Sequence, residues 1–225
     1  MSQWDDLKPR VISALVMAVA GIVVTLFGSI PFDILMLMVA LIGLRELWMM
    51  IRKRLGSPID IMIFFAYAFM IIAGCLAFAI VRAQGGASAV FFLAGVVVVS
   101  DIAGYFAGRL IGGPKFWPRV SPKKTWSGTI AGWLGAAVLG GCVALYMIST
   151  QDIHAMSGIW FMPLVAALLA FAGQLGDIVE SAIKRRCGVK DSADLIPGHG
   201  GVLDRFDAMI GVGFVVAVLL LITQG

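Results

Sequence analysis

The sequence predicts an all-α, polytopic integral membrane protein. Hydrophobic residues make up 60% of the 225 residues and charged residues only 13%, which is about half of the ~25% found in a typical soluble domain. The apolar residues gather in runs of roughly 20, the length with which an α-helix crosses a bilayer. The 27 glycines suit helices that pack closely together in lipid. We therefore expect a single membrane-embedded domain over residues 1–225.

About seven apolar runs are long enough to be transmembrane helices. Residues 1–90 supply the amino-terminal helices, and residues 91–225 supply the later helices together with two large polar loops, at about 108–128 and 179–207. The predicted helices are Val11–Ile30, Phe32–Ile51, Ile59–Val81, Ala87–Ala107, Thr129–Ile148, Ile159–Ile178 and Ala208–Ile222.

The basic residues predict how these helices are oriented. Fifteen of the 17 fall before the first helix or after the second, fourth and sixth, and only Arg82 falls on the opposite side when seven helices alternate. The positive-inside rule therefore predicts a cytoplasmic amino terminus and two cytoplasmic polar loops. The net charge of +4 points to membrane lipids and small anions as partners, and not to nucleic acid. The three cysteines follow neither zinc-site nor disulfide spacing.

Four aspartates near the predicted cytoplasmic helix ends are candidates for chemistry. Asp101 and Asp177 lie in apolar runs, where a carboxylate is costly and normally faces a polar cavity. If the last helix begins near Leu203, Asp204 and Asp207 share a face in its first turn, where backbone amides favour anions. Asp177, Asp204 and Asp207 together would offer oxygen ligands to Mg²⁺, which is commonly shared with substrate phosphates. The alternatives are salt-bridged acids at helix ends and an exposed helix cap.

The polar loop between these acids combines cations with a glycine-rich turn. Its cations are Lys184, Arg185, Arg186 and Lys190. Gly200 and Gly201 permit close backbone approach to a ligand, and successive N–H groups in such a turn form an anion-binding nest. His199, in the same turn, is a candidate phosphate donor or metal ligand. A solvated histidine in an ordinary turn is the alternative.

The earlier polar loop holds a second cationic cluster. Lys123 and Lys124 lie between Ser121 and Thr125, and two lysines flanked by hydroxyl groups are suited to hold a polyphosphate. An ordinary basic loop that binds lipid headgroups is the alternative.

Two charged residues lie near the cytoplasmic end of the second predicted helix. Arg45 and Glu46 are adjacent, so they do not face each other on a helix. We interpret each as pairing with another helix, which is a structural role.

A long pattern of spaced residues runs through residues 181–207. It consists of Ser181, Lys184-Arg185, Lys190-Asp191, Pro197, His199-Gly200-Gly201, Asp204-Arg205 and Asp207. This pattern resembles the signature of the phosphatidate cytidylyltransferases, also called CDP-diacylglycerol synthases. The stretches GQLGDIVES, residues 173–181, and GRLIGGPKFWPRVSPKKTWSG, residues 108–128, are also similar to that family. The resemblance covers the carboxyl-terminal half, and the first ninety or so residues match only as hydrophobic helices.

The resemblance implies a nucleotidyltransferase of phospholipid biosynthesis, which converts CTP and phosphatidate into CDP-diacylglycerol and pyrophosphate. The lipid phosphate would attack the α-phosphorus of CTP in line, with catalysis by positioning and charge neutralisation. The resemblance also implies Mg²⁺, with K⁺ as a second cation, and a homodimer as one form of assembly. It places the protein in the bacterial inner membrane, with the active site on the cytoplasmic side.

The family signature also assigns roles to residues of this chain. The implied metal ligands are Asp177, Asp204 and Asp207. The implied catalytic residues are Asp177, Asp204, Asp207, Lys184, Arg185 and His199. The implied substrate-binding residues are Ser121, Lys123, Lys124, Thr125, Ser181, Lys190, Asp191, Gly200, Gly201 and Arg205. Two features depart from the family pattern: the chain is shorter than typical members, and Ser127 stands where relatives often have glutamate.

Three other classes of protein share some of these features. Transporters also combine acids with interrupted helices, but here the charges concentrate in loops and the sequence has no visible repeat. CDP-alcohol phosphatidyltransferases and lipid kinases also use Mg²⁺ and carboxylates, but the former carry several spaced aspartates within one helix, a pattern not found here. A catalytically inactive scaffold of the same fold is disfavoured by the complete set of charged signature residues.

Overall fold

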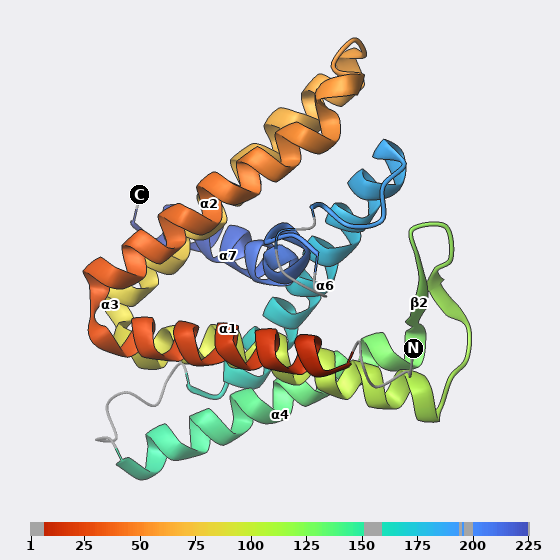
Figure 1. The fold of residues 1–225 in the computed structure, drawn as a ribbon. Helices are drawn as coiled ribbons and strands as arrows, with labels where there is room; N and C mark the ends of the chain where they lie inside the picture. The colour runs from red at the N-terminus through yellow and green to blue at the C-terminus, as the bar shows by residue number, and fades with distance from the viewer. Residues whose placement is uncertain (1–6, 151–158, 194, 196–199, 225) are drawn as a thin grey trace.

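A computed structural model describes residues 7–150, 159–193, 195 and 200–224, and these residues form a helical bundle with one small β-hairpin (Figure 1). The elements, in chain order, are α1 (Leu7–Phe27), α2 (Ser29–Ile51), the short 3₁₀-helix η1 (Arg52–Arg54), α3 (Pro58–Leu110), β1 (Lys115–Trp117), β2 (Ser121–Thr125), α4 (Trp126–Thr150), α6 (Met162–Cys187) and α7 (Leu203–Gln224). The prediction of a helical membrane protein is confirmed.

The prediction of seven spanning helices is wrong. The described residues form six α-helices, five of which are long and apolar enough to cross a membrane. The main difference is α3, whose 53 residues include both Ile59–Val81 and Ala87–Ala107. The chain bends at Gly86 with a φ of 71°, a conformation that glycine adopts readily because it lacks a Cβ atom. Figure 1 shows α3 as two arms joined by this bend. In α1, the apolar stretch Leu15–Phe27 is shorter than a span.

The first polar loop is not an irregular segment. Strands β1 and β2 pair in antiparallel fashion, with Lys115 opposite Thr125 and Trp117 opposite Ser121. The ring of Phe116 packs edge-on against Trp126, with centroids 4.6 Å apart. The hairpin therefore holds the cations of β2 on a defined backbone.

The second polar loop begins later than predicted, because α6 continues past Ile178 to Cys187. Three basic residues in its last turn face the negative end of the helix dipole, which is a favourable placement for cations. Gly188, with a φ of 73°, caps the helix. At the other end of the loop, α7 begins at Leu203, as the sequence suggested.

The core lies where α2, α3 and α7 meet. Leu47, Ile71 and Leu203 are fully buried there. Helix α3 packs against α2, α4 and α7, and α6 packs against α4 and α7. Large apolar side chains such as Leu134 and Leu221 are exposed on the outside, as expected of an integral membrane protein whose helices are solvated by lipid.

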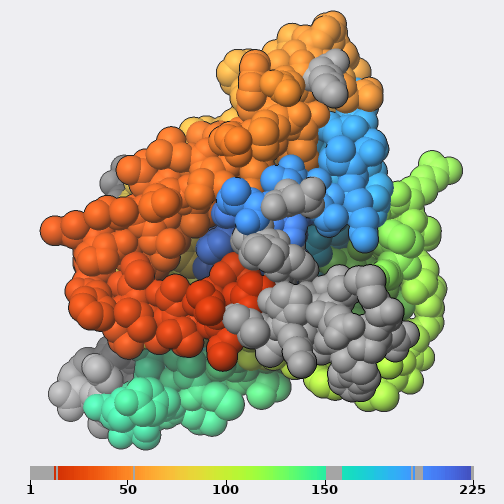
Figure 2. Space-filling view, in the orientation of Figure 1, coloured from red at the N-terminus to blue at the C-terminus, as the bar shows by residue number. Residues whose placement is uncertain are grey.

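An ion-pair cluster joins the end of α6 to the α2–α3 connection. The buried Asp60, in the first turn of α3, lies 2.5 Å from Arg186 Nε and 3.5 Å from Arg54 Nε. Figure 2 shows α1 and α2 on the left of one face, with the end of α6 and the hairpin on the right. Figure 1 shows that the α2–α3 connection, the end of α6 and the hairpin, which are distant in the sequence, lie toward the upper right of the molecule.

We expect Gly86→Ala to destabilise the fold by about 1–2 kcal/mol, because an alanine at positive φ brings its Cβ atom too close to the backbone. Gly56→Ala is the control, since a Cβ atom there would meet no neighbour and the φ at Gly56 is not positive. The measurement is the thermal unfolding midpoint in detergent. Equal midpoints for the two variants would contradict a strained backbone at Gly86.

Candidate active site

Three carboxylates meet between α6 and α7. Asp177 and Glu180 lie on α6 and Asp207 lies on α7, and one oxygen from each falls within 4.8 Å of the others. Glu180 is completely buried, and the two aspartates are half-buried. Like charges at this distance repel each other strongly in a medium of low dielectric constant, so the cluster requires nearby cations.

Small residues bring the two helices close enough to form this carboxylate cluster. A Cβ atom on Gly176 would lie 2.5 Å from the carbonyl oxygen of Asp207 and 2.9 Å from the Cα atom of Gly211. The two helix backbones are thus in direct contact immediately beside Asp177 and Asp207. On α6, Asp177 and Glu180 are three residues apart, so they share one helix face.

Glu180 is the most constrained member of the carboxylate cluster. Its Oε2 forms an ion pair with Lys184 Nζ at 2.5 Å. Within the described residues, the buried Oε1 has no hydrogen-bond partner. Such an atom is normally satisfied by another group, an ordered water or an ion.

Lys184 connects the cluster to Asp204. Its Nζ also lies 2.5 Å from Asp204 Oδ1, so one ammonium group neutralises two carboxylates. The other oxygen, Asp204 Oδ2, accepts hydrogen bonds from the backbone N–H groups of Ser192 and Gly201, both at 2.8 Å. Both oxygens of Asp204 are therefore bonded to other groups of the protein. The third carboxylate of the cluster is Glu180, and not Asp204 as the sequence predicted. Glu180 is not among the metal ligands predicted from the sequence, although a continuation of the helix past Ile178 would place it on the same face as Asp177.

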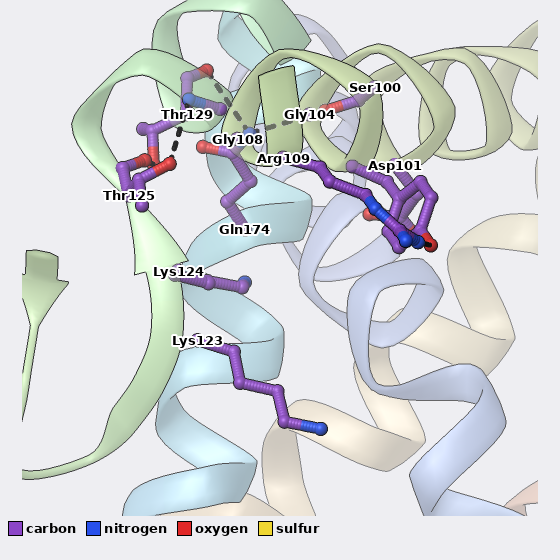
Figure 3. Close-up of a pocket in the computed structure, with 12 residues that line it drawn as sticks. Ser100, Asp101, Gly104, Gly108, Arg109, Lys123, Lys124, Thr125, Thr129 and Gln174 are labelled. Atoms are coloured by element: carbon purple, nitrogen blue, oxygen red, sulfur yellow. Dashed lines mark hydrogen bonds between the residues drawn. The ribbon is translucent and has the colours of Figure 1, made fainter. Parts of the chain in front are cut away.

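A pocket of about 370 Å³ opens beside the cluster, between α3, β2, α4 and α6 (Figure 3). Its cations are Arg109 from α3 and Lys123 and Lys124 from β2. Lys124 Nζ lies 2.5 Å from Asp177 Oδ2 and thereby links the pocket to the cluster. Asp101, on α3, also lines this pocket.

The inner wall of the pocket is a network of neutral polar groups. Gln174 Nε2 donates to Ser100 Oγ and to the carbonyl oxygen of Thr129, both at 3.3 Å, and its Oε1 accepts from Trp133 Nε1 at 2.9 Å. The buried Thr125 Oγ1 accepts from the backbone N–H of Gly128 at 3.2 Å. These bonds fix α3, α4 and α6 around the pocket, and Figure 3 shows Lys123 and Lys124 projecting from β2 on the same side.

Other residues predicted from the sequence lie at varying distances from this centre. Ser181 Oγ donates to Asp177 Oδ1 at 3.2 Å, so Ser181 belongs to the site. Ser121 is half-buried on β2. Four of the others are exposed at the surface of the α6–α7 region: Arg185, Lys190, Asp191 and Arg205. His199 lies outside the described residues, so its predicted role remains a prediction.

The predicted glycines approach the chain's own carboxylates. Gly200 has a φ of 82°, and a Cβ atom there would lie 2.7 Å from Asp204 Oδ2. A Cβ atom on Gly201 would lie 2.5 Å from Glu46 Oε2. Ser127 donates to the carbonyl oxygen of Gly112 at 2.5 Å and so closes the base of the hairpin.

The fold and this site define a class: integral membrane proteins whose helices join a carboxylate cluster to a cationic pocket. Residues 53–223 match the profile of the cytidylyltransferase family, and the chain belongs to that family. The resemblance inferred from the sequence is thereby confirmed.

Curated relatives carry a more specific name. The "Phosphatidate cytidylyltransferase" of Brucella suis is 48% identical over 125 residues, which are 56% of this chain and 44% of that protein. A protein of the same name from Staphylococcus epidermidis is 44% identical over 128 residues, 57% of this chain and 47% of that protein. One from Staphylococcus saprophyticus is 40% identical over 126 residues, 56% of this chain and 46% of that protein. The chain spans about half the length of the curated relatives it matches.

We expect Gly176→Ala to separate α6 from α7 and to destabilise the protein by about 1–3 kcal/mol, the usual cost of overpacking. Gly141→Ala in α4 is the control, because its added Cβ atom would make an ordinary 3.8 Å contact with Pro163. The thermal unfolding midpoint in detergent measures both changes. An unchanged midpoint for Gly176→Ala would contradict the direct backbone contact.

Proposed function

We propose that the protein is a phosphatidate cytidylyltransferase, which converts CTP and phosphatidate into CDP-diacylglycerol and pyrophosphate. One observation carries this proposal: the Lys124–Asp177 ion pair joins a cation-lined pocket to a cluster of carboxylates. Transfer of a cytidylyl group from a nucleotide to a lipid phosphate needs both features, since the substrates are anionic and negative charge develops on the leaving group. The family and the names of the relatives support the same reaction.

The reaction itself needs no covalent protein intermediate. An oxygen of the lipid phosphate forms a bond to the α-phosphorus of CTP. The bond from that phosphorus to the oxygen bridging to the β-phosphorus breaks, and pyrophosphate leaves with that oxygen and the bonding electrons. The protein contributes position and charge.

The carboxylate cluster fits Mg²⁺. Its ligands are all oxygens, as this hard cation prefers, and the buried Glu180 Oε1 lacks a partner among the described residues. We propose that Asp177, Glu180 and Asp207 hold the ion. When bound, Mg²⁺ would stabilise negative charge on phosphate oxygens. K⁺ as a second cation finds no support in the described residues and is not part of this proposal.

The basic residues divide into two groups by their contacts. Lys123, Lys124 and Arg109 line the pocket and would hold substrate phosphates. Lys184 is occupied by Glu180 and Asp204, so it would neutralise the carboxylates and keep them in place. Ser181 would orient Asp177 through its 3.2 Å hydrogen bond. Arg185, Lys190 and Arg205 would attract anionic substrates to the surface of the α6–α7 region.

We propose that the site faces the cytoplasm of a bacterial cell, with CTP arriving from the aqueous side and phosphatidate from the bilayer. The α2–α3 connection, the end of α6 and the hairpin lie toward one side of the molecule (Figure 1), and all three are basic. The positive-inside rule favours the cytoplasm for such a side. A homodimer remains a prediction from the family resemblance.

We expect Asp207→Asn to lower the rate of cytidylyl transfer by about 100-fold or more, because it removes a charged ligand from the proposed metal site. The assay uses purified protein in proteoliposomes with phosphatidate, labelled CTP and Mg²⁺, and counts cytidine label in the lipid fraction. Asp33→Asn is the control, since Asp33 is an exposed acid on α2. Near-normal transfer by the Asp207 variant would contradict the metal site, and an absence of labelled lipid from the wild type would overturn the proposed reaction.

We expect Lys124→Gln to lower kcat/KM for cytidylyl transfer by about 10- to 100-fold, which corresponds to the ~1.5–3 kcal/mol of a charged hydrogen bond. Lys115→Gln, on the paired strand of the same hairpin and outside the pocket lining, should change it by less than about twofold. Steady-state kinetics in the same proteoliposomes test both variants. Equal kinetics for the two would remove Lys124 from the proposed site.

A further inference from the structure

The structure buries a charged residue of α2 against the start of α7. Glu46 is 0% exposed, and it precedes residues 53–223, the segment that matches the family profile. The sequence indicated only that Glu46 pairs with another helix. In the structure, Glu46 contacts both the start of α7 and Ser192 in the preceding loop.

Glu46 accepts hydrogen bonds from the backbone amides of Leu203, the first residue of α7, and of Val202 just before it. Its Oε1 accepts from the N–H of Val202 and its Oε2 from the N–H of Leu203, both at 2.9 Å. These amides have no carbonyl partner within the helix, because the first turn of any α-helix leaves its N–H groups unpaired. The carboxylate also faces the positive end of the helix dipole. Glu46 therefore fixes the point at which α7 begins.

The same carboxylate leads through a hydroxyl group to the candidate active site. Ser192 Oγ lies 2.8 Å from Glu46 Oε2 and 2.9 Å from Asp204 Oδ2. The hydroxyl carries one proton, so the two carboxylates share it. Asp204 then binds Lys184, which in turn pairs with Glu180 of the carboxylate cluster. A continuous polar chain thus runs from α2 to the proposed metal ligands.

Gly201, two residues before α7, packs closely against Glu46 and Ser192. A Cβ atom on Gly201 would clash with Ser192 Oγ and would lie 2.5 Å from Glu46 Oε2. Movement of the Glu46 carboxylate is therefore transmitted to the residue whose N–H binds Asp204. Asp207 lies about one helical turn after Asp204 on α7, so a shift at the start of the helix would also move Asp207.

A second buried acid provides the contrast. Asp60 is 1% exposed, and its arginine partners are Arg54 and Arg186, both of which are exposed. Among the described residues, Asp60 forms its ion pairs with these two arginines and not with members of the carboxylate cluster. Asp60 is therefore a suitable control for Glu46, because it is equally buried and stabilises the fold without contacting the candidate site.

We propose that Glu46 is a positioning residue, which sets the first turn of α7 and thereby places Asp204 and Asp207 against Asp177 and Glu180. This inference rests on the proposed metal site of the previous subsection, and only its turnover readout rests on the proposed reaction. Residues behind metal ligands typically change metal affinity or activity by about 10- to 100-fold when they are removed.

The test measures metal binding without substrate. Mn²⁺ serves as the probe and its binding to the purified full chain in detergent is followed by electron paramagnetic resonance. We expect Glu46→Gln to weaken Mn²⁺ binding by about tenfold or more, because the amide nitrogen presents a donor to groups that are themselves donors. We expect Asp60→Asn to lower the thermal unfolding midpoint and to leave Mn²⁺ affinity within about twofold of the wild type.

Ser192→Ala tests the link without removing the helix cap. This variant keeps both hydrogen bonds from backbone amides to Glu46, so the chain should fold. We expect its Mn²⁺ affinity to fall by a few-fold. Should Glu46→Gln fail to fold, wild-type affinity in Ser192→Ala would overturn the proposal. Wild-type affinity in Glu46→Gln would also overturn it, as would a loss no larger than that of Asp60→Asn, or a wild-type protein that binds no Mn²⁺.

Measurements of turnover distinguish a failure of the proposed reaction from a failure of the positioning role of Glu46. If the wild type transfers cytidylyl groups, Glu46→Gln should lower kcat at saturating substrates, and the lost rate should be partly recovered at high Mg²⁺ concentration. If the wild type forms no labelled lipid while Glu46→Gln still weakens Mn²⁺ binding, the proposed reaction fails and the positioning role is supported.

Discussion

The burial of several carboxylates in an apolar helical bundle is the constraint on which the rest of the structure depends. Asp177, Glu180 and Asp207 lie within a few ångströms of one another, in surroundings where an uncompensated charge is costly. Each nearby feature offsets part of this cost. Lys184 neutralises Glu180 from the same helix, and Lys124 neutralises Asp177 from the hairpin. In the proposed metal site, a divalent cation would neutralise the remaining negative charge of the three carboxylates.

The two lysines also divide the site into two parts. Lys124 belongs to the hairpin and couples the carboxylate cluster to the pocket, where the anionic parts of a substrate would lie. Lys184 belongs to α6 and couples the cluster to Asp204, the loop around Ser192 and finally α2. In the proposed function, the first connection would serve substrate recognition, because Lys124 and Asp177 are partly exposed. The second would keep the carboxylates in place, because Lys184 and Asp204 are largely buried and bonded to each other.

Helix packing makes this arrangement possible. Gly176 and Gly211 allow the backbones of α6 and α7 to touch, and in lipid such close contact replaces the hydrophobic driving force that holds soluble bundles together. The bend at Gly86 turns α3 back on itself, so that one arm packs on the amino-terminal helices and the other carries the wall of the pocket. A few glycines thus decide where the charged residues meet.

The sequence by itself determined the class of protein and the family, and it named Asp177, Asp207, Lys124 and Lys184, which the structure brings together in the candidate site. Composition and the length of apolar runs reflect a lipid environment, and the spaced residues of 181–207 reflect the reactive groups that the family shares. Both are properties of the linear sequence, so no tertiary structure is needed to recognise them. Only the tertiary structure decided that two predicted helices are arms of α3, that Glu180 joins Asp177 and Asp207, and that Asp204 is bound to Lys184 and the adjoining loop. It also revealed that Glu46 caps a helix more than 150 residues away in the chain. These features depend on contacts between distant segments, which local periodicity and spacing do not encode.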